Sequence, residues 1–259
     1  TIISIPSVIV MTCLLLSLWG GSIRFTVPML FAIAFLPMFG IGGLTGIPLA
    51  FNSSDMALHD SYYIIGHFHY VVAPGTIFGV FAGIYYWFPK ATGRHMNVAL
   101  GRIHFWGSLV CMNLIFFPMM IQGLAGMGRR MSDGGLNYAA AHPSNEGVIG
   151  ALSPTIMNLN TTIAWSVLAL ALFQLPFIFN FFYSIFAGRR VESDNPWQAT
   201  TLEWQTPTPP PHGNFAQDVV VYRDPYAYSL AYALQPSTSG ATWSGDGDGE
   251  APDFEAQNQ

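Results

Sequence analysis

Five long apolar stretches alternate with shorter polar segments along the first three quarters of the chain. None of them has Lys, Arg, Asp or Glu in its interior, and each approaches or exceeds the roughly 20 residues that a helix needs to cross a bilayer core. Their apolar residues do not alternate as those of a membrane β-barrel strand do. The pattern therefore predicts an all-α membrane protein with five transmembrane helices, at about residues 2–19, 25–51, 61–88, 103–127 and 155–186.

The composition agrees with a chain that mostly meets lipid. Only 9% of its residues are charged, against about 25% in an average soluble domain. Aromatic residues make up 15%, and Trp and Tyr gather at membrane interfaces. The formal net charge of −5 gives no indication of nucleic-acid binding. We expect interfacial anchors at Tyr62, Tyr63, Tyr85, Tyr86 and Trp87.

Basic residues predict the orientation of the helices. Most Lys and Arg lie in segments that fall on one side of the predicted bundle, which the positive-inside rule identifies as the cytoplasmic or matrix side. The opposite side carries residues 52–60, which contain no Lys or Arg, and residues 128–154, where Arg129 and Arg130 break the rule. The arginine pair therefore needs a specific role.

Beyond Arg190 the chain changes character. Residues 206–211 have the sequence TPTPPP, which favours an extended backbone, and residues 237–250 are rich in Ser, Gly and Asp. We expect residues 1–190 to form one transmembrane unit and residues 191–259 an irregular extramembrane tail with a flexible end. The start at Thr1, next to an apolar run, indicates a fragment, a processed product or one half of a split subunit.

Two histidines inside the third apolar stretch are the main candidates for chemistry. Ionisable groups within membrane helices are rare and usually functional. His67 and His69 are two positions apart, which corresponds to roughly 200° around a helix, so we expect their imidazoles to face opposite sides. They are therefore better placed to bind two separate metals than to share one, and imidazole is a common ligand of haem iron. The alternative is that both histidines serve only in packing between helices.

Neighbouring residues in this segment complete the predicted site. Phe68 would lie near both metals, and Gly66 would allow a bulky ring to approach the backbone. His59 and Asp60 offer a nitrogen and a carboxylate oxygen, which suit a divalent cation such as magnesium or an ordered water cluster. Taken alone, Asp60 is better explained as a helix cap, and Asp55 alone as a solvated loop residue.

Arg129 and Arg130 end the fourth apolar stretch on the same side as this acidic cluster. Guanidinium groups pair well with carboxylates, and haem carries two propionates. The alternative for Arg129 and Arg130 is a solvated pair near Asp133. The remaining histidines show no partner pattern, and we expect them to be surface or interfacial groups: His95, His104, His142 and His212.

Several of these motifs resemble subunit I of the haem–copper oxidases, in the same order along the chain. Residues 59–70, HDSYYIIGHFHY, resemble the signature of the tenth helix of that family, and residues 123–133, GLAGMGRRMSD, resemble the loop after the eleventh. GLTG at residues 43–46 resembles the ninth helix, and LEW at 202–204 with PPP at 209–211 resembles the C-terminal tail. The resemblance extends from about residue 3 to residue 211 and implies part of a twelve-helix bundle.

The resemblance implies a role for each matching residue. His67 is similar to the ligand of the high-spin haem, and His69 to a ligand of the low-spin haem, with electrons passing close to Phe68. Arg129 and Arg130 are similar to the propionate partners, and Asp55 to an acid on the propionate side. His59 and Asp60 are similar to the pair near the magnesium site.

The chain also departs from the family pattern. The copper-ligand histidines, the cross-linked tyrosine and the second low-spin ligand of the family have no counterpart in it, so an upstream half or another chain must supply them. Many members carry Thr and Lys, the lysine for proton uptake, where this chain has Ser7 and Val10. Nitric oxide reductases of the same superfamily often lack that lysine.

We therefore expect a haem-binding half-bundle from the catalytic subunit of a terminal oxidase that reduces dioxygen to water and moves protons. The implied cofactors are two haems, copper held from outside the chain, and magnesium. The implied partners are the other oxidase subunits, one of them for electron entry, and cytochrome c or quinol as donor. The implied location is a bacterial or archaeal plasma membrane or the mitochondrial inner membrane. A nitric oxide reductase and a non-catalytic di-haem subunit are the alternatives.

Overall fold

The computed structural model describes residues 2–133, 146–147, 150–151, 154–199 and 201–215. Contacts divide the chain into two compact units, one comprising residues 1–87 and 96–189 and the other residues 88–95 and 190–259. The larger unit contains nearly all the helices, and the smaller one includes the last residues of helix α5, Phe78–Thr92. The predicted boundary at residue 190 stays a prediction.

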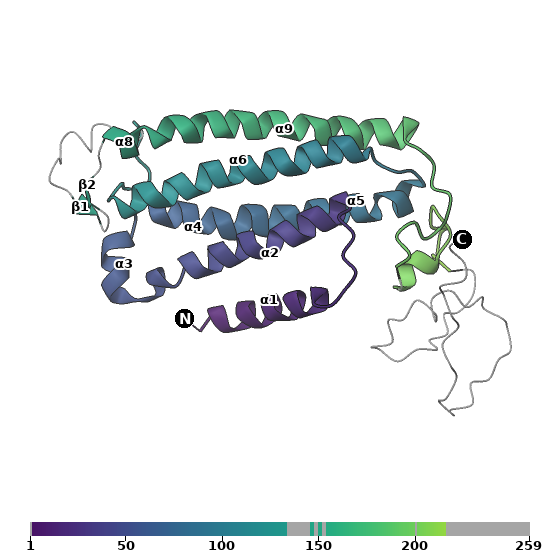
Figure 1. Cartoon of the computed structure of the whole chain (residues 1–259), viewed down its shortest axis with the longest axis horizontal. Helices are drawn as coiled ribbons and strands as arrows, with labels where there is room; N and C mark the ends of the chain where they lie inside the picture. The colour runs from purple at the N-terminus through teal and green to yellow at the C-terminus, as the bar shows by residue number, and fades with distance from the viewer. Residues whose placement is uncertain (1, 134–145, 148–149, 152–153, 200, 216–259) are drawn as a thin grey trace, which may run out of the picture. The chain divides into compact units, whose positions relative to one another are not determined.

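The larger unit is built from long apolar helices that pack side by side, as Figure 1 shows for α2, α4, α6 and α9. Four segments are long and apolar enough to cross a membrane: Val27–Ala50, Tyr62–Thr92, Val98–Leu124 and Thr155–Ala187. The first apolar stretch forms the shorter helix α1, Ser4–Leu18, of 15 residues. Four of the five expected transmembrane helices thus have the length that a bilayer requires.

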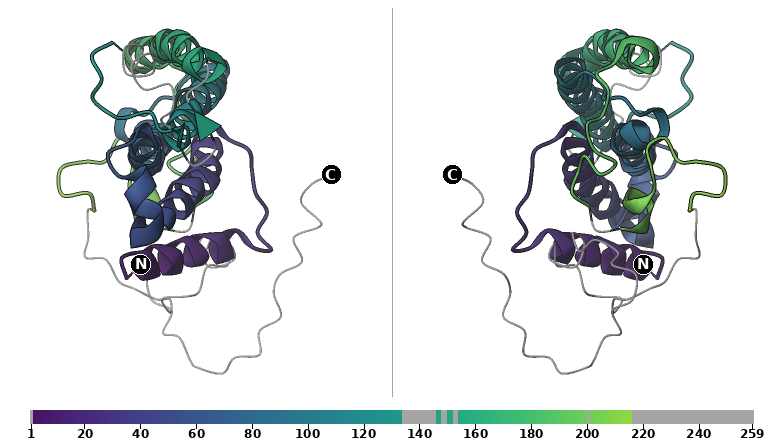
Figure 2. Two further views of the ribbon diagram at one scale, coloured as in Figure 1. Left: turned by 90° about the vertical axis from the view of Figure 1, so that its left-hand side faces the viewer. Right: turned by 90° about the vertical axis from the view of Figure 1, so that its right-hand side faces the viewer.

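The elements of the larger unit follow the chain in a simple order. Helix α2 is followed by a short 3-10 turn η1 and the short helix α3, and α4 continues through a π-helical segment η2 into α5. The bounds are α2 Val27–Thr45, η1 Pro48–Ala50, α3 Asn52–Leu58, α4 Tyr62–Val72, η2 Ala73–Ile77, α5 Phe78–Thr92, α6 Val98–Leu124, α8 Pro154–Met157 and α9 Leu159–Ala187. Two-residue strands β1, Glu146–Gly147, and β2, Gly150–Ala151, form an antiparallel pair. Figure 2 shows the long helices end on.

Two helix ends differ from the expected ones. Helix α6 begins at Val98, several residues before the expected start, because the Asn97 side chain caps it by accepting a 3.1 Å hydrogen bond from the Leu100 amide. Arg102, which precedes the expected helix at residues 103–127, therefore lies in α6. Helix α5 runs on to Thr92 and so includes Lys90.

Hydrogen bonds that involve polar side chains join helix α9 to α6 and to the residue that caps α6. At one end the Asn97 amide donates to the Asn180 side chain over 2.8 Å, and in the middle Gln174 contacts both His104 and Ser108. Without water in the bilayer core, such bonds between helices stabilise a defined pairing. The pairing of α6 with α9 thus depends on specific polar contacts as well as on apolar packing.

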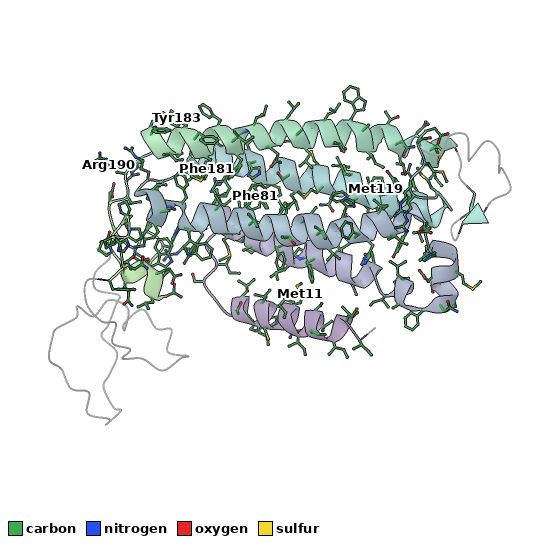
Figure 3. The ribbon with its side chains drawn as sticks, turned by 180° about the vertical axis from the view of Figure 1, so that it is seen from behind. Met11, Phe81, Met119, Phe181, Tyr183 and Arg190 are labelled. Atoms are coloured by element: carbon green, nitrogen blue, oxygen red, sulfur yellow. The ribbon has the colours of Figure 1, made fainter. Side chains whose placement is uncertain are left out.

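The expectation for His104 was wrong, because this side chain is completely buried. Its ring contacts the Tyr85 hydroxyl at 3.2 Å and the Gln174 side chain at 3.1 Å. Phe81, labelled in Figure 3, packs edge-on against the same ring at 4.4 Å between centroids. Tyr63 and Tyr85 are likewise buried at 6% and 4% exposure, so they are not interfacial anchors. His142 lies outside the described residues.

The smaller unit is organised around Lys90, which is only 5% exposed. Its ammonium donates hydrogen bonds to the Asp194 carbonyl at 2.9 Å, the Thr206 carbonyl at 2.6 Å and the Thr208 hydroxyl at 3.0 Å. The ammonium also lies 5.4 Å from the centre of the Trp204 ring, which belongs to the 3-10 turn η3, Leu202–Gln205. A buried charge is stable only with such compensation, so Lys90 holds this segment in place.

Candidate functional site

Helix α4 carries the two histidines and begins at a cap that the sequence did not indicate. The Ser61 side chain accepts a 3.3 Å hydrogen bond from the Tyr63 amide, so Ser61, not Asp60, caps the helix. Asp60 precedes the cap with a positive φ of 56°, a conformation that Asp tolerates better than most residues. The alternative explanation of Asp60 as the helix cap is therefore wrong by one residue.

His67 points toward the end of helix α2. Its Nδ1 lies 2.8 Å from the Gly42 carbonyl oxygen and 3.1 Å from the Thr45 hydroxyl. A carbonyl oxygen can only accept, so Nδ1 carries the proton, and the lone pair of the neutral ring is on Nε2. This arrangement is typical of histidines that bind a metal through Nε2.

His69 lies against helix α6. Its ring stacks on Phe116, with 4.9 Å between centroids and 21° between planes. Its Nδ1 lies 2.7 Å from the Ile65 carbonyl one turn earlier in α4, so Nδ1 again donates and the lone pair is again on Nε2. His67 and His69 thus contact different helices, in agreement with the opposite faces that the helical geometry predicts.

The residues between and beside the histidines differ in their surroundings. Phe68 is 52% exposed and touches the His69 ring edge-on at 5.3 Å between centroids. A methyl group added to Gly66 would lie 2.9 Å from the Phe116 carbonyl oxygen and 3.1 Å from the Met120 amide nitrogen. The group that approaches the Gly66 backbone is therefore helix α6, where we expected a bulky cofactor ring.

A row of ionisable side chains precedes helix α4. His59 lies between two carboxylates, 3.5 Å from Asp55 and 3.7 Å from Asp60, and Asp60 forms an ion pair with Arg129. Asp55 lies in the short helix α3, where a solvated loop residue was expected. In the part of the chain that the structure describes, no group of three or more His, Cys, Asp and Glu side chains is arranged to hold a metal ion. His59 and Asp60 could therefore supply only part of a magnesium site.

Arg129 and Arg130 differ from each other. The loop that carries them is bonded to the start of α4, because the Tyr62 amide donates to the Met127 carbonyl and the Arg129 amide to the Asp60 carbonyl. The Nε of Arg129 is buried and has no hydrogen-bond partner among the described residues. Arg130 is exposed and adopts a positive φ of 64°. Only Arg129 thus joins the charged cluster directly, with a buried donor that suits an anion.

Four residues at the end of helix α2 and the start of α4 surround or support His67, and none of them was assigned this role from the sequence. Gly42 and Thr45 contact the imidazole, and the Tyr63 hydroxyl donates to the Thr45 carbonyl over 2.9 Å. A methyl group on Gly46 would lie only 2.7 Å from Cε1 of His67, so the ring needs a glycine there. The glycine-rich segment at 42–46 is the feature of the sequence that indicates a close approach of another group to the backbone of α2.

These features define a helical integral membrane protein in which two histidines of one helix contact different neighbouring helices. A family profile described as "Cytochrome C and Quinol oxidase polypeptide I" matches residues 1–149. The chain therefore belongs to the cytochrome c and quinol oxidase subunit I family. It is similar to cytochrome c oxidase subunit 1 of Synechocystis sp., with 42% identity over 214 residues that make up 83% of this chain and 35% of that protein.

Other relatives give the same result. The alternative cytochrome c oxidase subunit 1 of Bradyrhizobium diazoefficiens is 43% identical over 236 residues, which are 90% of this chain and 38% of that protein. A solved structure of a heme-copper terminal oxidase dimer shares 23% identity and superposes with a TM-score of 0.52 over 64% of this chain and 28% of that chain. This likeness concerns the fold alone. The chain spans little more than a third of the length of these curated relatives.

Proposed function

We propose that this chain forms the haem-ligating part of the catalytic subunit of a terminal respiratory oxidase that reduces dioxygen to water. The observation that carries the proposal is the pair of imidazoles whose Nδ1 atoms both donate to backbone carbonyls. Each ring thereby presents an unprotonated Nε2 in a different direction. A pair of histidines that served only in packing would have no need for this matched arrangement.

In this proposal His67 ligates a high-spin haem and His69 a low-spin haem. Haem iron supplies the oxygen binding and the electron transfer when it is bound. The Gly42 carbonyl and the Ile65 carbonyl fix the two imidazoles in the required tautomer and orientation. Phe68 lies between the two histidines in sequence, and electrons would pass between the haems close to it.

The charged cluster takes part at the edge of the same site. Arg129 would pair with haem propionates through its buried Nε, and Arg130 would add a second, solvent-accessible guanidinium. Asp55, His59 and Asp60 would form a polar region next to the propionates, which suits exchange of protons with water. His59 and Asp60 would supply two ligands to a magnesium ion or partners to ordered water.

The site needs partners that this chain does not supply. The copper ligands and the second low-spin ligand would come from the upstream half of the subunit or from another chain. Other oxidase subunits would deliver electrons from cytochrome c or quinol, and proton translocation would accompany turnover. The location would be a bacterial or archaeal plasma membrane or the mitochondrial inner membrane, with the C-terminus on the cytoplasmic or matrix side.

Val10 favours a second candidate, a nitric oxide reductase of the same superfamily. Val10 has an aliphatic side chain, is 57% exposed and cannot carry a proton. The test is metal analysis of the purified complex together with its oxygen and nitric oxide turnover. Two haems with one copper and rapid oxygen consumption are expected for the oxidase. Non-haem iron with nitric oxide turnover would identify the reductase, and haem without either activity a non-catalytic subunit.

A further inference from the structure

The last carbonyl groups of helix α2 are bonded to side chains of helix α4. A helix leaves its last four carbonyls without partners inside the helix, and in α2 these belong to residues 42–45. The Gly42 carbonyl accepts from His67 and the Thr45 carbonyl accepts from Tyr63. Because His67 and Tyr63 are four residues apart, they lie on one face of α4. The end of α2 and this face of α4 therefore form one hydrogen-bonded unit.

Thr45 has the central place in this unit. Its hydroxyl donates to the Gly42 carbonyl over 2.8 Å, which uses its only proton. The protonated Nδ1 of His67 lies 3.1 Å from the same hydroxyl oxygen, which can then only accept. The Nδ1 proton of His67 is thus shared between two acceptors, the Gly42 carbonyl and the Thr45 hydroxyl.

The position of the ring is fixed by close packing as well. The glycine at residue 46 leaves room for Cε1 of His67, and a methyl group on Gly42 would lie 2.9 Å from the backbone of Tyr70 and Val71. The two helices are therefore in direct contact next to the imidazole. A small displacement of Thr45 would therefore also displace the His67 ring, because no other side chain lies between them.

We propose that Thr45 is a positioning residue that raises the basicity of His67 and holds its ring in place for iron. A second acceptor at Nδ1 gives the imidazole more negative character and makes Nε2 a stronger electron donor. The effect is to favour ferric over ferrous iron at this haem. The inference rests on the proposed function, since it requires His67 to be an iron ligand.

The test compares hydroxyl-bearing and hydroxyl-free variants of Thr45 in the assembled complex. Thr45→Val keeps the shape and removes the second acceptor, and Thr45→Ser keeps the hydroxyl. Thr12→Val is the matched control, because the Thr12 hydroxyl donates to the Val8 carbonyl within helix α1, away from His67. Two properties are measured for each protein: the iron–histidine stretching band of the reduced high-spin haem and the midpoint potential of that haem.

The expected result is a shift of the band to lower frequency and a rise of the potential in Thr45→Val. Thr45→Ser and Thr12→Val should match the unaltered protein. If Thr45→Val does not assemble, Thr45→Ala provides the same comparison with a smaller side chain. An unchanged band in the hydroxyl-free variant, or an equal shift in Thr45→Ser, would overturn the proposal.

The proposed function is tested separately in the same experiment. His67→Ala should abolish the iron–histidine band altogether. If the band persists in that variant, His67 is not the ligand, and the proposed function fails whatever the Thr45 variants do. If the band is lost there and unchanged in Thr45→Val, only the role of Thr45 is refuted.

Discussion

Helix α4 crosses α6 so closely at Gly123 that a single methyl group should separate them. A methyl added there would meet the Tyr63 backbone, 2.5 Å from its Cα and 2.6 Å from its Cβ, and also the Tyr63 amide nitrogen. Contacts below 3.0 Å essentially never occur for a real Cβ. These atoms are two backbone atoms and the Cβ of Tyr63, and none of them moves when the side chain rotates, so rotation cannot relieve the clash. Gly123→Ala must therefore displace the first turn of α4, which leads to both histidines.

The change in the free energy of unfolding caused by Gly123→Ala is the sum of two opposing effects. Overpacking a tight contact costs about 1 to 3 kcal/mol. Because the contact here is with the backbone, we take the upper end, about 3 kcal/mol. Ala is a better helix former than Gly by about 1 kcal/mol. The net destabilisation of Gly123→Ala is then about 2 kcal/mol, or a factor of about 30 in the unfolding equilibrium.

The assay is thermal unfolding of the purified complex in one detergent, followed by helical circular dichroism at a fixed scan rate. Gly79→Ala is the matched control, because a methyl group there would meet nothing within 4 Å. It should leave the midpoint unchanged or raise it. A Gly123→Ala protein that unfolds at or above the temperature of the control would refute the close packing of α4 on α6.

Two further predictions concern the polar contacts of the bundle. Gln174→Leu removes a hydrogen-bond partner of both His104 and Ser108. The loss of these bonds should lower the free energy of unfolding by about 1 kcal/mol. An unfolding midpoint equal to that of the unaltered protein would contradict this prediction. Lys90→Met removes three hydrogen bonds to the segment after α9. Limited proteolysis between residues 191 and 211 should therefore become faster. An unchanged cleavage rate would show that Lys90 does not hold this segment.

The sequence was sufficient to predict four long apolar helices, because long apolar runs in a membrane protein have few other solutions. It also predicted that His67 and His69 face different ways, since that depends only on the helical repeat. The ends of α5 and α6 were missed because a capping side chain at Asn97 and a buried ammonium at Lys90 decide them. Such local details lie outside the apolar pattern.

The surroundings of the site could not be predicted, because they depend on segments far apart in the chain. The acceptors of His67 lie on α2, 25 and 22 residues earlier, and His104 bonds to a residue 70 positions away. A single histidine on an apolar helix gives no sign of such partners. For the same reason, Gly66 was expected to face a cofactor, whereas it faces the backbone of α6.

The most direct test of the central claim is the haem spectrum of His67→Ala and His69→Ala, each measured reduced, oxidised and with carbon monoxide. The account predicts that His67→Ala loses the carbon monoxide difference signal of the high-spin haem and keeps the low-spin bands. His69→Ala should lose the low-spin bands instead. If both variants keep both haems, or if either substitution removes neither signal, these histidines do not hold two separate haems and the account is wrong.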